Sequence, residues 1–305
     1  MSDLHGVIVV DKPAGPSSFG VVQEVRRALG MRRVGHGGTL DPMATGVLAV
    51  CVGEGTKIAG FFLGADKEYE AEVELGVATD TYDAMGQVTA RCDASGVTEA
   101  QVRAALDRFL GPIRQRPPAY SAIKQDGQRL YARARAGEEV EAPERDVEIR
   151  QIEVLGLALP RVRFRVACSK GTYVRSLAAD LGAALGVGAH LTALRRTRTG
   201  RFTLADAVAL AALRDAHQAG TLRVLSPAEA LAGLARVVVP AATERAVRCG
   251  QPLRAAQLGL IEGGAPGPLV ILSARGDLVA VAEPPDGPEA RVKLLRVFNT
   301  GAAAS

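Results

Sequence analysis

Tryptophan is absent from this sequence, and aromatic residues make up only 4% of its 305 residues. Proteins that hold long single strands by stacking successive bases use many aromatic side chains, so that mode of binding is not indicated. Cysteine is also scarce: Cys51, Cys92, Cys168 and Cys249 are widely spaced, without a CxxC pair or a His/Cys ligand spacing. We therefore expect neither a metal site nor a disulfide framework, and we expect the thiols to be buried and free.

Long apolar runs are missing too. No stretch reaches the roughly 20 apolar residues that a membrane-spanning helix requires. The first apolar run, Val7 to Val10, is followed at once by Asp11 and Lys12 and is too short for a secretory signal. We therefore expect a cytoplasmic protein. Its length and its hydrophobic content of 48% predict two domains, or one large domain with a small one.

Acidic residues are scarce in one part of the chain, although the formal net charge is only +4. Basic residues recur between positions 161 and 201, and Asp180 is the only acid among them. A second basic cluster comprises Arg26, Arg27, Arg32 and Arg33. Such clusters suit a polyanion, whose phosphates would dominate the affinity. Taken alone, they favour nucleic acid only slightly over arginines that simply face solvent.

The first third of the chain alternates between strand and helix patterns. Val7 to Val10 predicts a buried strand. Ser17 or Ser18 can cap a helix that ends at Gly30. In residues 67–75, Tyr69 shares the covered face of an alternating strand, and glutamates share the other face. Further elements are predicted as a strand at 47–52 and a helix at 56–62.

The rest of the chain predicts an α+β fold with a mixed, largely antiparallel sheet. Thr98 and Gln101 form a capping-box pattern that opens a helix. Residues 112–140 have little periodicity and resemble an insertion or lid. Other elements are predicted as strands at 147–157 and 162–166, a helix after Tyr173, an exposed strand or ribbon at 190–202, and helices at 204–212 and 227–234. After residue 236, short β-like runs separated by turns predict a small β-barrel.

One short stretch is rich in glycine and carries a single carboxylate. Residues 35–46 contain four glycines, with Asp41 in the middle and Pro42 after it. Glycine permits positive φ or a close approach to a ligand, and proline biases the residue before it toward an extended conformation. Asp41 is therefore displayed on a shaped loop, as catalytic groups often are. By glycine content alone, a structural turn with a solvated aspartate is the simpler interpretation.

Several common chemistries are excluded by the motifs. Asp41 has no partner carboxylate at a glycosidase-like spacing, no nucleophile elbow is present, and no P-loop or dinucleotide fingerprint implies a nucleotide cofactor. A lone aspartate can act as a nucleophile if it stays ionised while shielded from water. Arg175 could supply the compensating charge, and Tyr69 or Tyr173 could offer a stacking surface for a planar base.

Six motifs occur in one order between about residues 5 and 205. They are Asp11-Lys12-Pro13-x-Gly15-x-Ser17-Ser18, Gly35-His36-x-Gly38-Thr39-Leu40-Asp41-Pro42-x-Ala44-Thr45-Gly46, Lys67-x-Tyr69, Pro117-Pro118-x-Tyr120-Ser121-Ala122-x-Lys124, Ser169-Lys170-Gly171-Thr172-Tyr173-x-Arg175 and Leu194-Arg195-Arg196-Thr197. Each motif alone is weak. Together and in this order they resemble the bacterial tRNA pseudouridine-55 synthase (TruB) family.

The resemblance implies a reaction at one uridine. Asp41 would attack the target uridine, and the uracil would be detached, rotated and rejoined to the ribose through C5. Whether the attack falls on C6 of the base or on C1′ of the ribose stays open. Tyr69 would stack on the flipped base and help in loss of the C5 proton, and Arg175 would pair with Asp41. No cofactor is implied, because the reaction is an isomerisation.

The same resemblance assigns substrate-binding roles to Lys12, Pro13, His36, Lys124, Tyr173 and Leu194. Tyr173 and Leu194 would wall the pocket, Lys12 and Pro13 would support its floor, and His36 would occupy the space that the extruded nucleotide leaves. Two positions depart from the family pattern. Gly37 stands where a hydroxyl residue is usual, which puts one RNA contact in doubt, and Met43 replaces a leucine.

The implied organisation is a catalytic domain over residues 1–235 and a PUA-like RNA-binding barrel over residues 236–305. The insertion at about 112–140 would grip the T-arm of tRNA, recognised by its shape as well as its bases. We expect a monomer without an obligate protein partner and without a membrane. Two alternatives remain: a synthase of the same fold that acts on another RNA, including the RNA-guided type, and a tRNA-folding chaperone in which catalysis is secondary.

Overall fold

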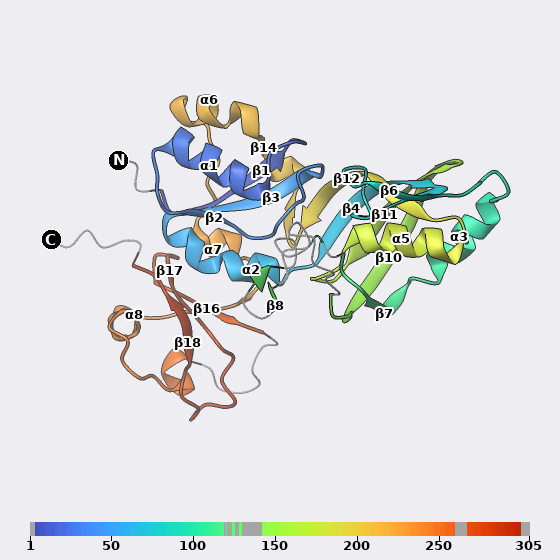
Figure 1. The fold of residues 1–305 in the computed structure, drawn as a ribbon. Helices are drawn as coiled ribbons and strands as arrows, with labels where there is room; N and C mark the ends of the chain where they lie inside the picture. Colours follow the sequence, from blue (N-terminus) through green and yellow to red (C-terminus); the bar gives the residue numbers. More distant parts are fainter. Residues whose placement is uncertain are drawn as a thin grey trace.

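The computed structural model describes residues 4–118, 120, 124–125, 128–129, 142–259 and 267–299. Within these ranges a ten-stranded sheet and a four-stranded sheet form the frame (Figure 1). The main path of the large sheet runs β14 (Val208–Ala209), β1 (Gly6–Lys12), β3 (Thr45–Val52), β12 (Ala189–Thr199), β4 (Lys67–Leu75), β11 (Arg161–Cys168), β10 (Arg145–Ala158) and β7 (Gly111–Gln115). Off this path, β2 (Val34–His36) pairs with β3, and β13 (Phe202–Thr203) pairs with β12.

Most strand pairs of the large sheet are antiparallel. The exceptions among the described strands are β1 with β14 and β3 with β12, which run parallel. Two separate two-stranded pairs, β5 (Val77–Thr79) with β6 (Val88–Arg91) and β8 (Lys124–Gln125) with β9 (Gln128–Arg129), are antiparallel as well. The predicted α+β class with a mixed, largely antiparallel sheet is therefore confirmed.

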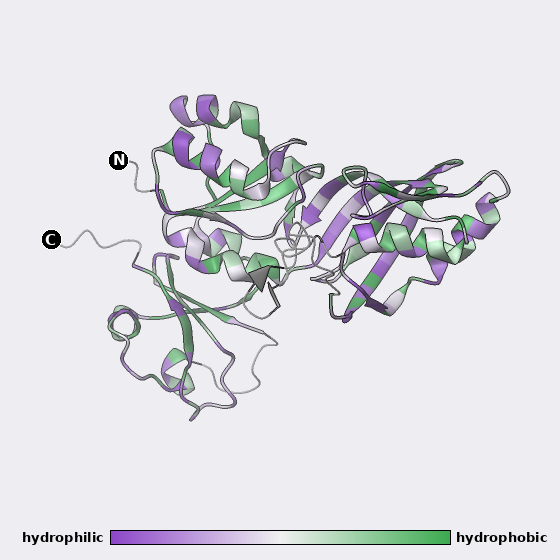
Figure 2. Ribbon diagram, viewed as in Figure 1, coloured by the Kyte–Doolittle hydropathy of each residue, from purple (hydrophilic) through white to green (hydrophobic). Residues whose placement is uncertain are grey.

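The β1–β3 half of the sheet is covered on both faces, which explains its unbroken apolar runs (Figure 2). Helix α1 (Ser18–Leu29) and helix α6 (Leu213–Gln218) cover one face, and α2 (Ala59–Leu63) and α7 (Pro227–Ala230) lie on the other. The predicted ends of α1 are confirmed. The Ser17 side chain accepts a hydrogen bond from the Gly20 N–H, and Gly30 adopts the left-handed conformation with φ 64°.

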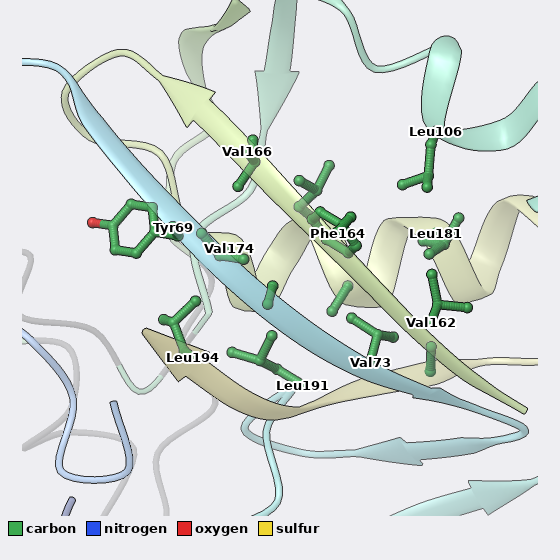
Figure 3. Close-up of a cluster of buried hydrophobic side chains, with 14 of the residues drawn as sticks. Tyr69, Val73, Leu106, Val162, Phe164, Val166, Val174, Leu181, Leu191 and Leu194 are labelled. Carbon is green, nitrogen blue, oxygen red and sulfur yellow. The ribbon is translucent and has the colours of Figure 1, made fainter. Parts of the chain in front are cut away.

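The other half of the sheet packs one face against helices α3 (Glu99–Asp107) and α5 (Val174–Ala184). Tyr69, Val73 and Phe164 are buried toward these helices, whereas the glutamates of β4 point away, as the alternating pattern predicts (Figure 3). The capping box between Thr98 and Gln101 opens α3 as expected. Tyr69 and Leu194 stand at one end of this core, where the Tyr69 hydroxyl points away from the apolar cluster.

Several element predictions were wrong or incomplete. Residues 53–58 form a 3-10 helix, η1 (Gly53–Ile58), before α2, and the helix predicted at 227–234 ends at Ala230 as α7. Gly55 lets the η1 segment pass close to β1, since a Cβ there would lie 2.0 Å from the Gly6 carbonyl oxygen. Residues 204–212 form η2 (Leu204–Asp206), β14 and η3 (Leu210–Ala212), since pairing of Val208 with Val10 interrupts any helix. Residues 111–115 belong to the sheet as β7 rather than to an insertion.

A further correction concerns β12. We predicted an exposed strand or ribbon at 190–202, but β12 pairs with β4 along most of its length and with β3 at Arg195 and Arg196. Its position inside the sheet buries Arg196, whose exposed fraction is 1%. The expectation of buried thiols is also only half right: Cys51 and Cys168 are buried, but Cys92 and Cys249 are exposed.

The C-terminal part contains the four-stranded sheet β15 (Ala235–Val238), β16 (Leu269–Leu272), β17 (Leu278–Ala282) and β18 (Leu294–Val297), with helix α8 (Ala241–Arg248) and η4 (Ala255–Leu258). The β-rich character is confirmed, although α8 was not predicted and the PUA-like barrel stays a prediction. Phe298 and Val270 share one apolar cluster with Val7, Ile58 and Phe62, so the two sheets have a common core. No helix in the described ranges is both long and apolar enough to cross a membrane.

Candidate active site

The loop between β2 and β3 is held in one conformation by buried polar contacts. The Ser18 hydroxyl accepts a hydrogen bond from the Leu40 N–H at 2.8 Å and donates one to the Leu40 carbonyl at 3.0 Å. The Lys12 ammonium, fully buried, donates to the carbonyls of Pro13, Pro42 and Ala44. These contacts hold the residues on both sides of Asp41, so the backbone that carries Asp41 is fixed in place.

Glycine is required where this loop meets β12. Gly46 has φ +101°, and a Cβ there would lie 2.2 Å from the Arg196 carbonyl oxygen. The glycine therefore serves a close backbone contact between β3 and β12. From β12, the Arg196 guanidinium reaches back and donates to the carbonyls of Gly38, Thr39 and Val47. A buried arginine thus connects the loop that carries Asp41 to the centre of the sheet.

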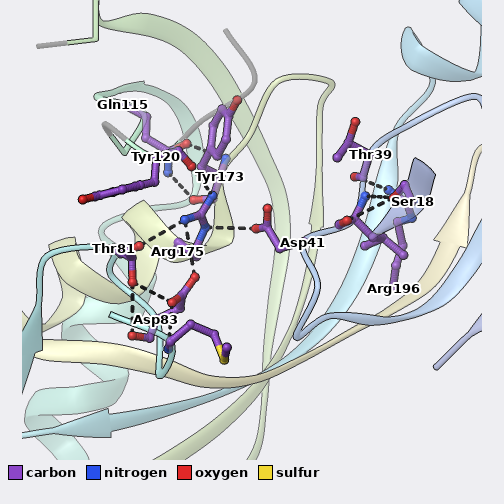
Figure 4. Close-up of polar contacts among 12 residues, drawn as sticks. Ser18, Thr39, Asp41, Thr81, Asp83, Gln115, Tyr120, Tyr173, Arg175 and Arg196 are labelled. Carbon is purple, nitrogen blue, oxygen red and sulfur yellow. Dashed lines mark hydrogen bonds and ion pairs between the residues drawn. The ribbon is translucent and has the colours of Figure 1, made fainter. Parts of the chain in front are cut away.

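Arg175 stands in the first turn of α5 and faces Asp41 (Figure 4). The Arg175 Nε lies 3.0 Å from the Asp41 Oδ2, and the Arg175 side chain is 6% exposed. This Nε–H is not aligned for a hydrogen bond, so the contact is an ion pair. The rest of the guanidinium is held by the Asp83 carboxylate at 3.4 Å and by the carbonyls of Thr81 and Tyr120. Together these partners fix the orientation of the Arg175 guanidinium.

Opposing effects act on the Asp41 carboxyl. Its side chain is 36% exposed, but the carboxyl is recessed, and this burial raises its pKa above the ordinary aspartate value. The Arg175 charge opposes the rise in pKa, the Asp83 charge adds to it, and the Lys12 charge again lowers the pKa. The Lys12 pKa is itself lowered to about 8, chiefly by burial. Burial and the neighbouring cations thus act on the ionisation of Asp41 in opposite directions.

The carboxylate opens into a pocket of about 250 Å³. Its walls include five residues that the sequence singled out: Asp41, Tyr69, Tyr173, Arg175 and Leu194. Tyr69 is 8% exposed, and burial raises the pKa of its hydroxyl, against the nearby Arg196 charge. The volume is below the range of about 300–1,000 Å³ typical of sites for drug-sized ligands. A pocket of this size, with one carboxylate beside aromatic and apolar side chains, suits a single small ring.

The other predicted site residues lie outside the pocket walls. Lys12 and Pro13 lie under or beside the loop, and Pro13 is exposed. His36 ends β2, half-buried, and its Nδ1 accepts from the Gly38 N–H at 3.4 Å. Burial and then the Arg196 charge lower the His36 pKa. Lys124 lies in β8, and its side chain is outside the described residues, as is most of the predicted insertion.

Three functional candidates escaped the sequence-based predictions. Asp83 comes from a turn-rich segment without periodicity and supports Arg175 from behind. Arg196 was treated as exposed because its neighbours Arg195 and Arg198 suggest a solvent-facing strand, yet its alternation with Leu194 places both on the pocket side. Lys67 also lines the pocket, and its ammonium donates to three carbonyls, two in the last turn of α2 and one just after it. Among the described residues, no group of three or more His, Cys, Asp or Glu could hold a metal ion.

Comparison with known proteins agrees with this arrangement. Residues 26–174 match the model "TruB family pseudouridylate synthase (N terminal domain)", and residues 175–241 match "tRNA pseudouridylate synthase B C-terminal domain". These two matches together include Asp41, Tyr69, Arg175 and Leu194. The matched ranges leave out residues 242–305, which carry β16, β17 and β18 of the four-stranded sheet.

Relatives extend the similarity over most of the chain. A tRNA pseudouridine synthase B from Xanthomonas euvesicatoria pv. vesicatoria (strain 85-10) is 50% identical over 82% of this chain and 82% of its own length. One from Burkholderia pseudomallei (strain 668) is 47% identical over 93% of this chain and 94% of its own. A solved structure of a Cbf5-Nop10-Gar1 complex has a similar chain, with a TM-score of 0.76, 30% identity, and coverage of 97% of this chain and 85% of that one. By its motifs, its fold and these relatives, the chain belongs to the TruB family of pseudouridylate synthases.

Proposed function

We propose that this chain converts the uridine at position 55, in the T-loop of tRNA, to pseudouridine, with Asp41 as the nucleophile. The observation that carries the proposal is the ion pair between Asp41 and Arg175 at the mouth of a pocket walled by Tyr69, Tyr173 and Leu194. The substrate class is supported by relatives of about 50% identity that bear the name tRNA pseudouridine synthase B.

The proposed reaction is an isomerisation, so atoms balance without a co-reactant. The Asp41 carboxylate attacks C6 of the uracil or C1′ of the ribose, and the bond between N1 and C1′ breaks. The detached uracil turns within the pocket, and a bond forms between C5 and C1′. The bond from Asp41 to C6 or C1′ breaks, which frees the carboxylate, while C5 loses its proton and N1 gains one. The base must leave its stack to reach the carboxylate, because the reacting atoms are inaccessible in a folded loop.

Each pocket residue has its own role in the proposed reaction. The Tyr69 ring stacks on the base, and its hydroxyl, which points away from the apolar core, assists loss of the C5 proton. Tyr173 and Leu194 confine the detached ring and keep water from the intermediate. Arg175 holds Asp41 in its ionised form against burial, and it orients the carboxylate for attack. Lys12 fixes the loop that carries Asp41.

We assign the recognition of tRNA to parts beyond the pocket. Residues 1–235 act as the catalytic domain, and residues 236–305 act as a PUA-like RNA-binding domain. The insertion, which begins after β7 and includes Lys124, grips the T-arm, and His36 fills the place of the extruded nucleotide. The protein works as a monomer on tRNA in the cytoplasm, with no other protein required.

Tritium release tests this function. A T-arm stem-loop with tritium at C5 of the target uridine is incubated with the wild type and with Asp41→Asn. We expect release of label to water by the wild type and none by the variant, because C5 becomes bonded to C1′. Absence of release under saturating wild-type enzyme would contradict the proposal. A stem-loop labelled only at another uridine is the control for the position.

The resemblance to RNA-guided synthases makes a second comparison necessary. Chains similar to this one come from a Cbf5-Nop10-Gar1 complex and from an H/ACA RNP bound to a substrate RNA. A stand-alone enzyme modifies bare tRNA without a guide RNA or partner proteins. We expect modification of an unmodified transcript by the purified chain. Activity that appears only after addition of a guide RNA would favour the RNA-guided alternative.

A further inference from the structure

Residues that connect β7 to the predicted insertion are bonded to the start of α5. Gln115, the last residue of β7, is 1% exposed. Its Oε1 accepts from the Tyr173 N–H at 2.7 Å, and its Nε2 donates to the Tyr173 carbonyl at 3.0 Å. The Ser176 hydroxyl donates to the Arg116 carbonyl at 2.7 Å. Four hydrogen bonds, counting that from Arg175 to the Tyr120 carbonyl, join the two segments.

These contacts act at a helix start that has no cap of its own. Tyr173 is the N-cap residue of α5 in an extended conformation, and its side chain makes no capping hydrogen bond. The Gln115 amide instead binds the backbone of that residue from a strand far away in the sequence. Tyr173 lines the pocket, and Arg175 follows two residues later. A rotation of this first turn would therefore move both side chains relative to Asp41.

We propose that Gln115 is a positioning residue for the reaction: its amide fixes the first turn of α5 and so aligns Tyr173 and Arg175 with Asp41. The inference rests on the function proposed above and adds a residue to it. Gln115 is not among the pocket-lining residues, so it acts through Tyr173 and not on the substrate. A misplacement of about 1 Å at a reacting group can lower the rate about a hundredfold.

The proposed role of Gln115 requires an amide side chain. Glutamine offers an acceptor and a donor at once, whereas a carboxylate only accepts. Gln115→Glu would still accept from the Tyr173 N–H but would place a second oxygen against the Tyr173 carbonyl. Gln115→Met, of similar length, would leave both backbone groups without these partners. We expect both variants to misalign the turn, with the methionine variant the simpler to interpret.

Kinetics on the labelled stem-loop test the inference, with Gln101→Met as the matched control. Gln101 is the capping-box glutamine of α3, a helix outside the pocket, so the control loses the same amide and weakens a helix start elsewhere. We expect Gln115→Met to lower kcat about tenfold, which corresponds to about 1.4 kcal/mol, with Kd for the stem-loop changed by less than about twofold. Gln101→Met should lower the Tm with kcat unchanged.

The ionisation of Asp41 gives a second readout that a general loss of stability would not move. If Arg175 drifts from Asp41, burial and the Asp83 charge still raise the Asp41 pKa, and only Lys12 opposes them. The acid limb of kcat should then move to higher pH in Gln115→Met and stay in place in Gln101→Met. A Gln115→Met enzyme with wild-type kcat, or with a lower kcat but an unmoved acid limb, would overturn the inference.

Carbon-13 NMR of the Asp41 carboxyl separates this inference from the proposed function. The titration needs no turnover, so it reads the alignment of Arg175 even if the wild type releases no tritium. A higher Asp41 pKa in Gln115→Met than in the wild type supports the positioning role. An identical pKa in the two proteins refutes it, whatever reaction the pocket performs.

Discussion

At the scale of single residues, Asp41 is governed by a balance between burial and two nearby cations. Burial makes the ionised form costly and raises the pKa, while Arg175 and Lys12 favour the ionised form. A nucleophilic carboxylate must be ionised, so activity should increase as pH rises through the Asp41 pKa. That pKa lies above the ordinary value of about 3.9, so the acid limb should lie above it too.

Arg175→Met tests this balance. Removing the cation leaves burial and the Asp83 charge to raise the Asp41 pKa further, so the acid limb of kcat should move to higher pH. We also expect kcat at its plateau to fall about a hundredfold or more, the usual cost of losing one preorganised electrostatic partner. A pH profile of tritium release measures both effects. An acid limb that stayed in place or moved to lower pH would show that Arg175 does not stabilise the carboxylate.

The structure gives a steric reason for glycine at position 37 that the sequence does not suggest. The sequence predicted that a missing hydroxyl here puts an RNA contact in doubt. In the structure, a Cβ on Gly37 would lie 2.6 Å from the Cβ of Phe62. Phe62 is a buried residue of α2 that also packs edge to face against Phe202. The glycine thus allows α2 to lie close to the loop that carries Asp41.

Gly37→Ser should therefore destabilise the protein without improving its affinity for tRNA. Forcing a side chain against Phe62 is overpacking, which costs about 1–3 kcal/mol. Thermal unfolding measures the loss, and Gly35→Ser is the matched control because a Cβ at Gly35 meets nothing within 4 Å. Equal Tm values for the two variants, or a tighter tRNA complex for Gly37→Ser, would restore the lost-contact interpretation.

At the scale of elements, the strand β4 places glutamates against part of the basic cluster between 161 and 201. Its glutamates stand opposite the arginines of β11, in the pairs Glu74 with Arg161, Glu72 with Arg163 and Glu70 with Arg165. Arg165 contacts Glu70 at 2.7 Å and, from β10, Glu153 at 2.8 Å. Exposed cross-strand pairs of this kind each contribute about 1 kcal/mol or less. The charge of Arg165 is therefore already paired within the sheet, so this arginine is less available to a polyanion.

Arg196 in β12, in contrast, is buried, and Arg196→Met tests how much its hydrogen bonds contribute to stability. Loss of the guanidinium leaves three carbonyls without this donor, two of them in buried hydrogen bonds, so we expect about 3 kcal/mol of lost stability. Arg196→Lys should restore only part of this, because an ammonium cannot reproduce the planar fork. Urea unfolding measures both. Arg198→Met, the same change on the same strand at a side chain that is 36% exposed, should lose less than about 1 kcal/mol, and a similar loss in both would contradict this account.

At the scale of the whole molecule, the C-terminal sheet shares an apolar core with the N-terminal part of the chain. Phe298 is fully buried in the cluster that contains Val7 and Ile58. The Lys57 ammonium also donates to the Val297 carbonyl at 2.6 Å and lies 5.4 Å from the centre of the Phe298 ring. The C-terminal residues therefore help to stabilise the N-terminal part of the chain.

Phe298→Ala should consequently lower the stability of the whole chain. Removing a buried phenylalanine costs about 3–5 kcal/mol, and we expect one cooperative transition at lower denaturant concentration. Val238→Ala is the control, because that side chain is 61% exposed and its loss should change stability by less than about 0.5 kcal/mol. Two separate transitions, with only the second affected by Phe298→Ala, would show independent domains instead.

The sequence alone determined the elements whose pattern is local. Helix α1, the capping box of α3 and the alternation of β4 follow from residues within one element, where period and caps are decisive. The motifs likewise pointed to Asp41, Tyr69, Tyr173, Arg175 and Leu194, which the structure brings together in one pocket. Local patterns suffice there because each motif carries its residue types at a set spacing, whatever the partner element is.

Tertiary structure alone decided which charges are buried and what supports them. Arg195 and Arg196 are neighbours with the same chemistry, yet only Arg196 is fully buried, because carbonyls from Gly38, Thr39 and Val47 converge on it. Asp83 behind Arg175 is likewise found only in the folded chain. A buried charge is tolerated only where groups from several elements meet it, and that convergence is a property of the fold and not of any one segment.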